Sequence, residues 1–237
     1  AITVLVLRIE HEREIVEKKG TGAKGMADQK RREDRRIQRT RQALQQAFVD
    51  VVREKGEALR SLPELEKCFA TTSIQEITAR ANVNRGTFYL HFTDKYMLAD
   101  AVVREQFHQQ LASVLPPEPR WDRRTLRLLI QAVLNALEKK YCHQHQPSLV
   151  LAPMVEQAVH EELTELLLTW LREARRGERR RGEPLETIAR VVSWAMFGTA
   201  IQWSQEETMV SSEEMADIIS QVIMEGVARL APDALPE

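Results

Sequence analysis

Apolar residues recur at helical spacing from residue 35 onward, and almost no segment alternates between apolar and polar positions as a β-strand does. The first helical pattern covers residues 34–55. Its apolar positions are Ile37, Leu44, Phe48, Val51 and Val52, and its opposite face carries Arg35, Arg39, Arg41 and Arg53. Gly56 can end this helix as a C-terminal cap. The pattern as a whole predicts an all-α protein.

Residues 57–68 form a short piece of mixed polar and apolar residues around Pro63 that can hold a helical turn, and two short helices follow it. Ser73 with Glu76 three residues later is a capping box that opens the first of them. Asn82 lies in the next turn, and asparagine is the expected residue where a turn needs a positive φ and has no glycine. Asn84 can then cap a second helix over residues 85–90. Two short helices joined by such a turn form a helix-turn-helix.

Longer amphipathic helices are predicted for the rest of the chain. We expect them over residues 94–115, 121–141, 148–160, 161–176, 184–205 and 211–230. Thr93 is the expected cap of the first, and a break at His160 separates the third from the fourth. Ser211 with Glu214 is a second capping box and opens the last.

Polar and cationic residues open the second short helix, the part that a helix-turn-helix inserts into the DNA major groove. Arg85 suits a bidentate contact with guanine, and Thr87 suits a phosphate or a thymine methyl group. Gly86 has no side chain, so the backbone can approach DNA closely. Three side chains follow on the flank where phosphates would lie: Tyr89, His91 and Lys95. The alternative is three short helices of an all-α core with polar outer faces.

The distribution of charge changes the meaning of a nearly neutral total. The chain has 34 Lys and Arg against 35 Asp and Glu, a net charge of −1 that by itself argues against nucleic acid. However, residues 24–98 carry 15 basic and 10 acidic groups, whereas residues 99–237 carry 15 basic and 21 acidic groups. This asymmetry indicates a polyanion-binding module on an acidic body, with a solvated helix face as the alternative.

Composition excludes several other classes. Apolar residues make up 43% and charged residues 29% of the chain, an ordinary globular balance. Two cysteines cannot form a disulfide framework, which favours a reducing cytoplasm. The amino-terminal apolar run, residues 2–7, is too short for a signal sequence or a membrane span, so no membrane partner is expected.

We predict no catalytic site, no metal and no cofactor, and therefore no enzyme. Residues 20–25 match GxGxxG, but charged segments stand where a dinucleotide site needs a strand and an apolar helix. Cys142, His143 and His145 lie close together without a second cluster to complete four metal ligands. His160 precedes two glutamates, but Thr164 stands where a zinc protease has its second histidine.

Two segments carry the most specific pattern of the chain, RTRQALQQAF from residue 39 and TTSIQEITARANVNRGTFYLHFTDKYML from residue 71. They resemble the amino-terminal domain of TetR-family (tetracycline-repressor-like) bacterial transcriptional regulators. The matching positions are Thr72, Ser73, Ile74, Ile77, Ala81, Val83, Gly86, Thr87, Phe88, Tyr89, His91, Phe92 and Lys95. The resemblance covers residues 35–115 by motif and residues 116–237 only by helix count and length.

The sequence departs from the family pattern in three places. Asn82 stands where glycine is usual, and residues 57–68 are an insertion between the first two helices. Family members usually begin shortly before the first helix, so Met26 is a natural start and residues 1–25 are either a foreign leader or a genuine arm. The basic end of such an arm would suit a DNA minor groove.

The resemblance implies a homodimeric repressor that leaves a pseudo-palindromic operator on double-stranded DNA when a small hydrophobic or amphipathic inducer binds. It implies three parts: a leader or basic arm over residues 1–33, with disorder as one alternative, a helix-turn-helix domain over 34–98, and a helical ligand-binding and dimerisation domain over 99–237. The DNA-binding residues carried over are Ser73, Gln75, Asn84, Arg85, Gly86, Thr87, Tyr89, His91 and Lys95. The alternative function is an all-α small-molecule-binding or enzymatic bundle whose helix-turn-helix is only structural.

Two residue sets are predicted in the carboxy-terminal helices. A ligand pocket among residues 94–176 would be lined by Phe107, Tyr141, Met154, Gln157 and Trp170. Small residues on the last two helices favour close approach of a second subunit. The predicted dimer interface is Trp194, Ala195, Gly198, Thr199, Met215, Ile219, Val222 and Gly226, with an intrachain core as the alternative.

Overall fold

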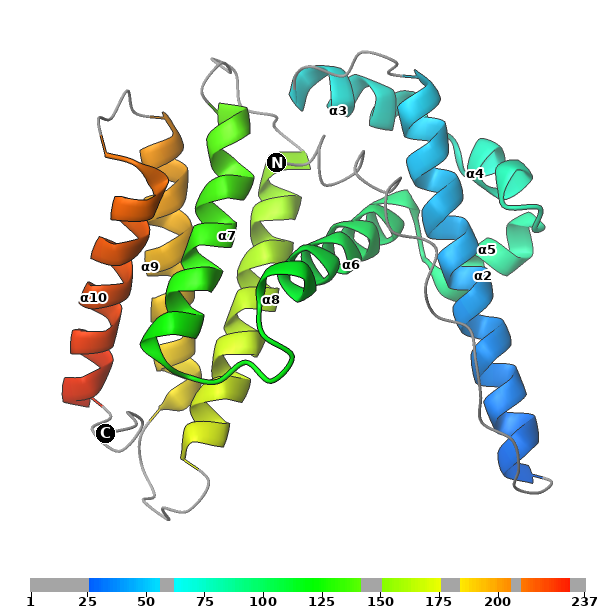
Figure 1. Cartoon of the computed structure of the whole chain (residues 1–237). Helices are drawn as coiled ribbons and strands as arrows, with labels where there is room; N and C mark the ends of the chain where they lie inside the picture. The colour runs from blue at the N-terminus through cyan, green and yellow to red at the C-terminus, as the bar shows by residue number, and fades with distance from the viewer. Residues whose placement is uncertain (1–25, 56–61, 142–150, 176–183, 206–209, 231–237) are drawn as a thin grey trace. The chain divides into compact units, whose positions relative to one another are not determined.

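The computed structural model describes residues 26–55, 62–141, 151–175, 184–205 and 210–230, and within these ranges it contains helices and no strand. The helices are labelled α2 to α10 in Figure 1. This confirms the predicted all-α fold for the described part of the chain. The chain divides into an amino-terminal unit, residues 2–103 with 148–151, and a carboxy-terminal unit, residues 104–147 with 152–237.

The amino-terminal unit is built from four helices and the start of a fifth. These are α2 (Met26–Lys55), α3 (Leu62–Thr71), α4 (Ile74–Arg80), α5 (Arg85–His91) and the first residues of α6 (Lys95–Val114). Helix α2 packs against α3 and α4, and α4 packs against α5. Each helix contributes buried apolar side chains to one core, among them Leu44, Phe48, Phe69, Ile77, Phe88 and Leu98.

Helix α2 is longer than the sequence pattern predicts. It begins at Met26 rather than at residue 34, so the last residues assigned to the leader are helical. No glycine or proline interrupts residues 27–55, and the added turns consist mainly of good helix formers. Ile37, predicted on the apolar face, is 47% exposed, so the buried stripe begins only at Leu44.

The predicted insertion contains most of a helix. Residues 56–61, which include the expected cap Gly56, lie outside the described residues, and α3 follows from Leu62. Phe69 of α3 is buried, and its ring meets the rings of Phe48 and Tyr96 edge-on at centroid distances of 5.9 and 5.1 Å. The end of the insertion therefore leads into the core of the amino-terminal unit.

The carboxy-terminal unit contains the remainder of α6 and four further helices: α7 (Arg123–Tyr141), α8 (Leu151–Ala174), α9 (Leu185–Gln205) and α10 (Ser212–Leu230). Helix α7 packs against both α9 and α10, which lie beside it in Figure 1. Arg127 of α7 forms an ion pair with Asp217 of α10. Among the described helices, none combines the length and the apolar character that a membrane span requires.

Two predicted boundaries of the long helices are wrong, one in each unit. Helix α8 runs unbroken through His160, because that side chain is buried and its Nδ1 lies 2.8 Å from the Ser193 hydroxyl of α9. Asp94, not Thr93, caps α6: one Asp94 carboxylate oxygen accepts hydrogen bonds from the backbone N–H groups of Tyr96 and Met97, at 2.8 and 2.9 Å. A carboxylate here also meets the positive end of the helix dipole.

Candidate nucleic-acid interface

Helix α4 begins with the predicted capping box. The Ser73 hydroxyl accepts a hydrogen bond from the backbone N–H of Glu76, and the Glu76 carboxylate accepts one from the backbone N–H of Ser73, at 3.2 and 2.8 Å. These two bonds satisfy donors that the start of a helix otherwise leaves unpaired. Arg80, at the other end of α4, forms an ion pair with Glu54 of α2. Helix α4 is therefore fixed at both ends.

The turn between α4 and α5 has the predicted left-handed residue. Asn82 has φ of 53° and is the only non-glycine residue with positive φ in the described part of the chain. The chain then reverses, and the backbone N–H of Val83 donates to the carbonyl of Thr78 at 3.0 Å. Asparagine occupies this conformation at lower cost than most residues, which explains how the turn forms without the usual glycine.

Asn84 caps helix α5 as predicted. Its side-chain oxygen accepts hydrogen bonds from the backbone N–H and the hydroxyl of Thr87, at 2.7 and 3.0 Å. A Cβ atom on Gly86 would come within 3.2 Å of that same oxygen, so glycine also leaves the cap undisturbed. Phe88 is fully buried and holds α5 against the core.

The outward face of α5 is polar, cationic and aromatic. Asn84, Arg85, Gly86 and Tyr89 are exposed, whereas Thr87 and His91 are half-buried. The Arg85 guanidinium donates to the Tyr89 hydroxyl at 3.1 Å and lies 5.7 Å from the centre of its ring. Arg85 and Tyr89 therefore form one preordered group whose remaining guanidinium donors stay available to an acceptor.

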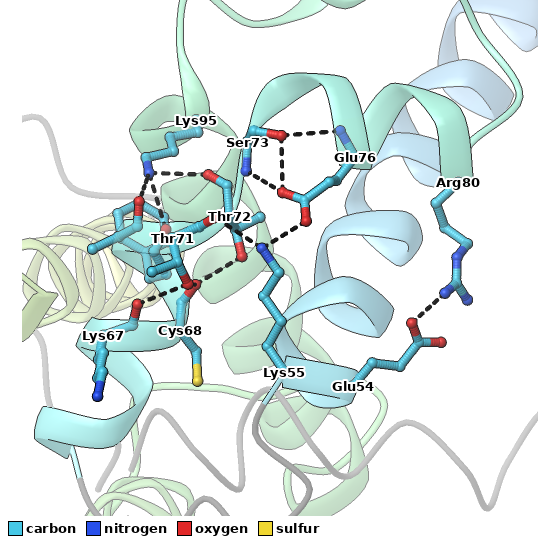
Figure 2. Close-up of polar contacts among 12 residues, drawn as sticks. Glu54, Lys55, Lys67, Cys68, Thr71, Thr72, Ser73, Glu76, Arg80 and Lys95 are labelled. Atoms are coloured by element: carbon cyan, nitrogen blue, oxygen red, sulfur yellow. Dashed lines mark hydrogen bonds and ion pairs between the residues drawn. The ribbon is translucent and has the colours of Figure 1, made fainter.

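Lys95 corrects a sequence-based prediction. Its ammonium donates to the backbone carbonyls of Phe69, Ala70 and Thr72, at 2.9, 2.9 and 3.1 Å (Figure 2). Burial lowers the pKa of Lys95, with a smaller contribution from the charge of Lys55. An ammonium has three protons, and all three are used here. We therefore assign Lys95 to bracing the end of α3 and not to the predicted phosphate contact.

Lys55 is a second brace, which no local sequence pattern predicts. Its ammonium donates to the Thr71 carbonyl at 2.8 Å and pairs with the Glu76 carboxylate at 2.8 Å, as Figure 2 shows. The hydrogen bonds from Lys55 and Ser73 lower the pKa of Glu76 to about 2. Lysines from α2 and α6 thus hold the junction of α3 and α4 from two sides. Only the capping box within this cluster has a local sequence signature.

The remaining predicted DNA-facing residues divide into two groups. Gln75 is exposed on α4 and is free to reach outward. The Ser73 hydroxyl is already engaged by Glu76, as described, so only its exposed edge remains for a further partner. Arg41 of α2 adds a cation beside the end of α5. Its guanidinium lies 5.0 Å from the ring centre of Phe92, the C-cap residue of α5.

The predicted pocket residues do not share one environment in the carboxy-terminal unit. Phe107 and Trp170 are buried, and Met154 is half-buried. Gln157 is exposed, and its amide donates to Glu161 one turn away on α8. The side chain of Tyr141 lies outside the described residues. Of the set, the structure therefore separates Gln157 from the two buried aromatic residues.

The predicted dimer interface falls mainly on exposed positions of α9 and α10, two neighbouring helices. Trp194 is 51% and Val222 66% exposed; Ala195, Thr199 and Gly226 are exposed, and Gly198 and Met215 are half-buried. Ile219 is only 6% exposed, so in the single chain it lies in the core. Sequence reasoning missed Val191 and Ile218, which are exposed apolar side chains on these helices.

Comparison with known families adds two matches. Residues 65–102 match the family described as "Bacterial regulatory proteins, tetR family", which includes α4 and α5. Residues 151–225 match the family described as "Transcriptional regulator C-terminal region".

Two individual relatives match only part of the chain. An uncharacterized HTH-type transcriptional regulator, YxbF of Bacillus subtilis (strain 168), is 34% identical over 85 residues, which are 36% of this chain and 20% of the relative. The HTH-type transcriptional repressor DhaR of Mycobacterium sp. (strain GP1) is 28% identical over 111 residues, 46% of this chain and 56% of the relative. The chain thus matches less than two thirds of either relative's length.

Among solved structures, the transcriptional regulator FadR from Bacillus subtilis, in complex with stearoyl-CoA, aligns with a TM-score of 0.43 and 16% identity. The alignment covers 78% of this chain and 98% of that chain.

Proposed function

We propose that the chain is a ligand-responsive transcriptional regulator of the TetR family, on the basis of the two family matches over residues 65–102 and 151–225. In this proposal it is a repressor and not an enzyme. It binds a pseudo-palindromic operator on double-stranded DNA as a homodimer, and a small hydrophobic or amphipathic inducer releases it. In this proposal it acts in the cytoplasm, where its DNA partner lies.

The observation that carries the proposal is the outward face of α5. The short helix α5, held by the buried Phe88, presents Arg85 and Tyr89 as a preordered pair beside the exposed Gly86. In a helix-turn-helix, the start of the second helix meets the base edges, and arginine is the commonest partner of guanine there. Exposed cations on the same unit supply the contacts with phosphate that fix the register.

Dimer formation is supported by the apolar side chains exposed on α9 and α10. Val191, Trp194, Ile218 and Val222 are each more than half exposed in the single chain. Large apolar surfaces of this kind mark sites of association in proteins that fold in water. A two-fold interface uses the same patch on both subunits, so one such face is sufficient. The two α5 helices of the dimer would then read the two half-sites of the operator.

The test is binding of the full-length protein to DNA from its own promoter, measured over a range of salt concentrations. Each phosphate contact displaces counterions, so we expect the affinity to fall steeply as salt rises. A double substitution that removes the preordered pair, Arg85→Ala with Tyr89→Ala, should abolish selection of one site over random DNA. Absence of detectable binding to promoter DNA at low salt would contradict the proposal.

A further inference from the structure

Among the described residues of the carboxy-terminal unit, the side chains of Gln106 and Trp121 are buried with no hydrogen-bond partner on any polar atom. Gln106 lies on α6 and is only 7% exposed. Both its amide nitrogen and its amide oxygen are buried without a partner. A primary amide offers two donors and an acceptor, so the whole hydrogen-bonding capacity of the side chain is unused. In the described part of the chain, no other residue has both polar atoms in this state.

The contrast with the neighbouring residues of the same helix is sharp. Arg104 pairs with Glu161 and Glu162 of α8, and His108 also contacts Glu162. Residues two positions apart on a helix point in nearly opposite directions, so Gln106 faces away from these charged partners. The charged side of α6 is thus satisfied and the Gln106 side is not. Leucine or methionine there would fill similar space without leaving polar atoms unpaired.

Buried polar groups are paired in the great majority of proteins, and an unpaired one calls for a physical reason. Leaving an amide unpaired away from water costs free energy that an apolar residue would not. Stability is commonly sacrificed in this way at sites that bind ligands. A bound molecule could therefore supply the hydrogen bonds that the Gln106 amide lacks.

We propose that Gln106 is the polar recognition group of the inducer site, and that the ligand is neutral. The matching group is one with a donor and an acceptor side by side, as in a carboxamide or a lactam, on an otherwise apolar body. The inference rests on the proposed function, because it names the ligand of the same regulator. It adds a residue and a chemical class to that function.

Charge argues for a neutral ligand over an anion. Residues 99–237 carry 15 basic and 21 acidic groups, so the surrounding field repels anions. The cation closest in sequence, Arg104, is already engaged with two carboxylates. On its side of α6, Gln106 is preceded by Val102 and Val103, which are buried and apolar. An apolar ligand with one paired polar group fits this environment.

Ligand binding would then stabilise one state of the protein selectively. In the ligand-free state the amide is covered by protein and unpaired, whereas in the bound state it exchanges two hydrogen bonds with the ligand. A ligand shifts a conformational equilibrium only by its difference in affinity for the two states. The unpaired amide supplies such a difference, because only the state in which it meets the ligand gains these bonds.

The first experiment measures unfolding by urea for the ligand-free wild type, Gln106→Met and Gln106→Leu. Removing an unpaired amide should raise the midpoint, in the methionine variant at least, because methionine follows the shape of glutamine. Gln109→Met is the matched control: Gln109 is exposed on the same helix and donates to Glu105, so its midpoint should not rise. A lower midpoint for both Gln106 variants would show that the amide is paired, and would overturn the inference.

The second experiment compares binding of octanamide and methyl octanoate, two probes of equal chain length of which only the amide has a donor. The wild type should bind octanamide about tenfold more tightly, the equivalent of one well-formed hydrogen bond. Gln106→Met should lose this preference while still binding methyl octanoate. Equal affinities in the wild type, a preference that survives the substitution, or no binding of either probe would each contradict the inference.

Promoter binding by the wild type keeps the two conclusions apart. If the protein binds its promoter but shows no preference for the amide probe, only the role of Gln106 fails. If it does not bind promoter DNA at low salt, the proposed function fails whatever the probes show.

Discussion

The face of α5 and the face shared by α9 and α10 are both exposed, but they are exposed for opposite physical reasons. On α5, Arg85 and Tyr89 point polar groups outward while a buried phenylalanine holds the helix in place. On α9 and α10, large apolar side chains such as Trp194 and Val222 are turned outward. The first face suits a hydrated, charged partner and the second an apolar one.

This difference has a consequence for salt. Binding through cations and phosphates weakens as salt rises, because releasing condensed counterions into a more concentrated salt solution gains less entropy. Burial of apolar surface does not weaken with salt and can strengthen in strongly hydrated salts. Within one proposed dimer, salt should therefore separate association with DNA from association between subunits. Substitutions on each face test whether the two are as distinct as this comparison suggests.

The largest effect is expected from placing a charge on the apolar face. Val222→Asp would bury two carboxylates, one from each subunit, in a dimer interface. We expect the dimer to weaken by roughly 2–4 kcal/mol, or about thirtyfold to a thousandfold in dissociation constant. Sedimentation equilibrium over a range of protein concentrations measures this directly.

Gln221→Asp is the matched control, since it adds the same charge at an exposed neighbouring position on α10. Its dissociation constant should remain close to that of the wild type. An unchanged dissociation constant for Val222→Asp would mean that the apolar face of α9 and α10 is not the dimer interface.

Arg85→Ala tests the other face. Removing a guanidinium that reads guanine should reduce the preference at one base position of the operator by about 1–3 kcal/mol and leave the other positions unchanged. Competition among operator variants with single base changes gives this preference. Arg120→Ala, an exposed arginine paired with Glu118 in the carboxy-terminal unit, is the control and should change nothing. A uniform loss across all operator variants would make Arg85 a phosphate contact instead.

The helix-turn-helix could be predicted to the residue because its rules are local. Ser73 with Glu76, the positive φ of Asn82 and the cap at Asn84 each depend on residues within three positions of one another. A short polar side chain that satisfies nearby backbone groups leaves its signature in the sequence. For this reason both ends of α4 and the start of α5 agree with the predicted pattern.

The braces around that motif could not be predicted, because their partners are distant. The Lys95 ammonium meets carbonyls more than twenty positions earlier in the chain, and no local pattern distinguishes it from a lysine that faces DNA. Helix α8 is a similar case. The break expected at His160 is absent, because the ring of this buried histidine has a hydrogen-bond partner in the Ser193 hydroxyl of α9. Exposure of Ile37 and burial of Ile219 also depend on which helices pack together.

Lys95→Met tests whether Lys95 stabilises the fold or contacts a DNA phosphate. Methionine keeps the apolar stem but removes three hydrogen bonds from a charged donor, so we expect unfolding to become easier by about 1–3 kcal/mol. Urea unfolding measures the loss, and Lys67→Met, at an exposed lysine on α3, is the control. A variant of unchanged stability whose DNA binding depends less steeply on salt would restore Lys95 as a phosphate contact.

The smallest effect concerns pH and tests how firmly the brace holds α4. Hydrogen bonds from Lys55 and Ser73 lower the pKa of Glu76 from 4.5 to about 2 in the folded state. The ionised carboxylate therefore stabilises the fold above the unfolded pKa, and this stabilisation is lost as pH falls from about 5 toward 2. Because Glu76 is exposed, the contribution is small.

Glu76→Gln should make the urea midpoint less dependent on pH over this window, whereas Glu213→Gln, at an exposed carboxylate on α10, should not. If both variants followed the wild type from pH 7 to pH 3, the lysine brace would contribute nothing measurable, and the capping box alone would fix the start of α4.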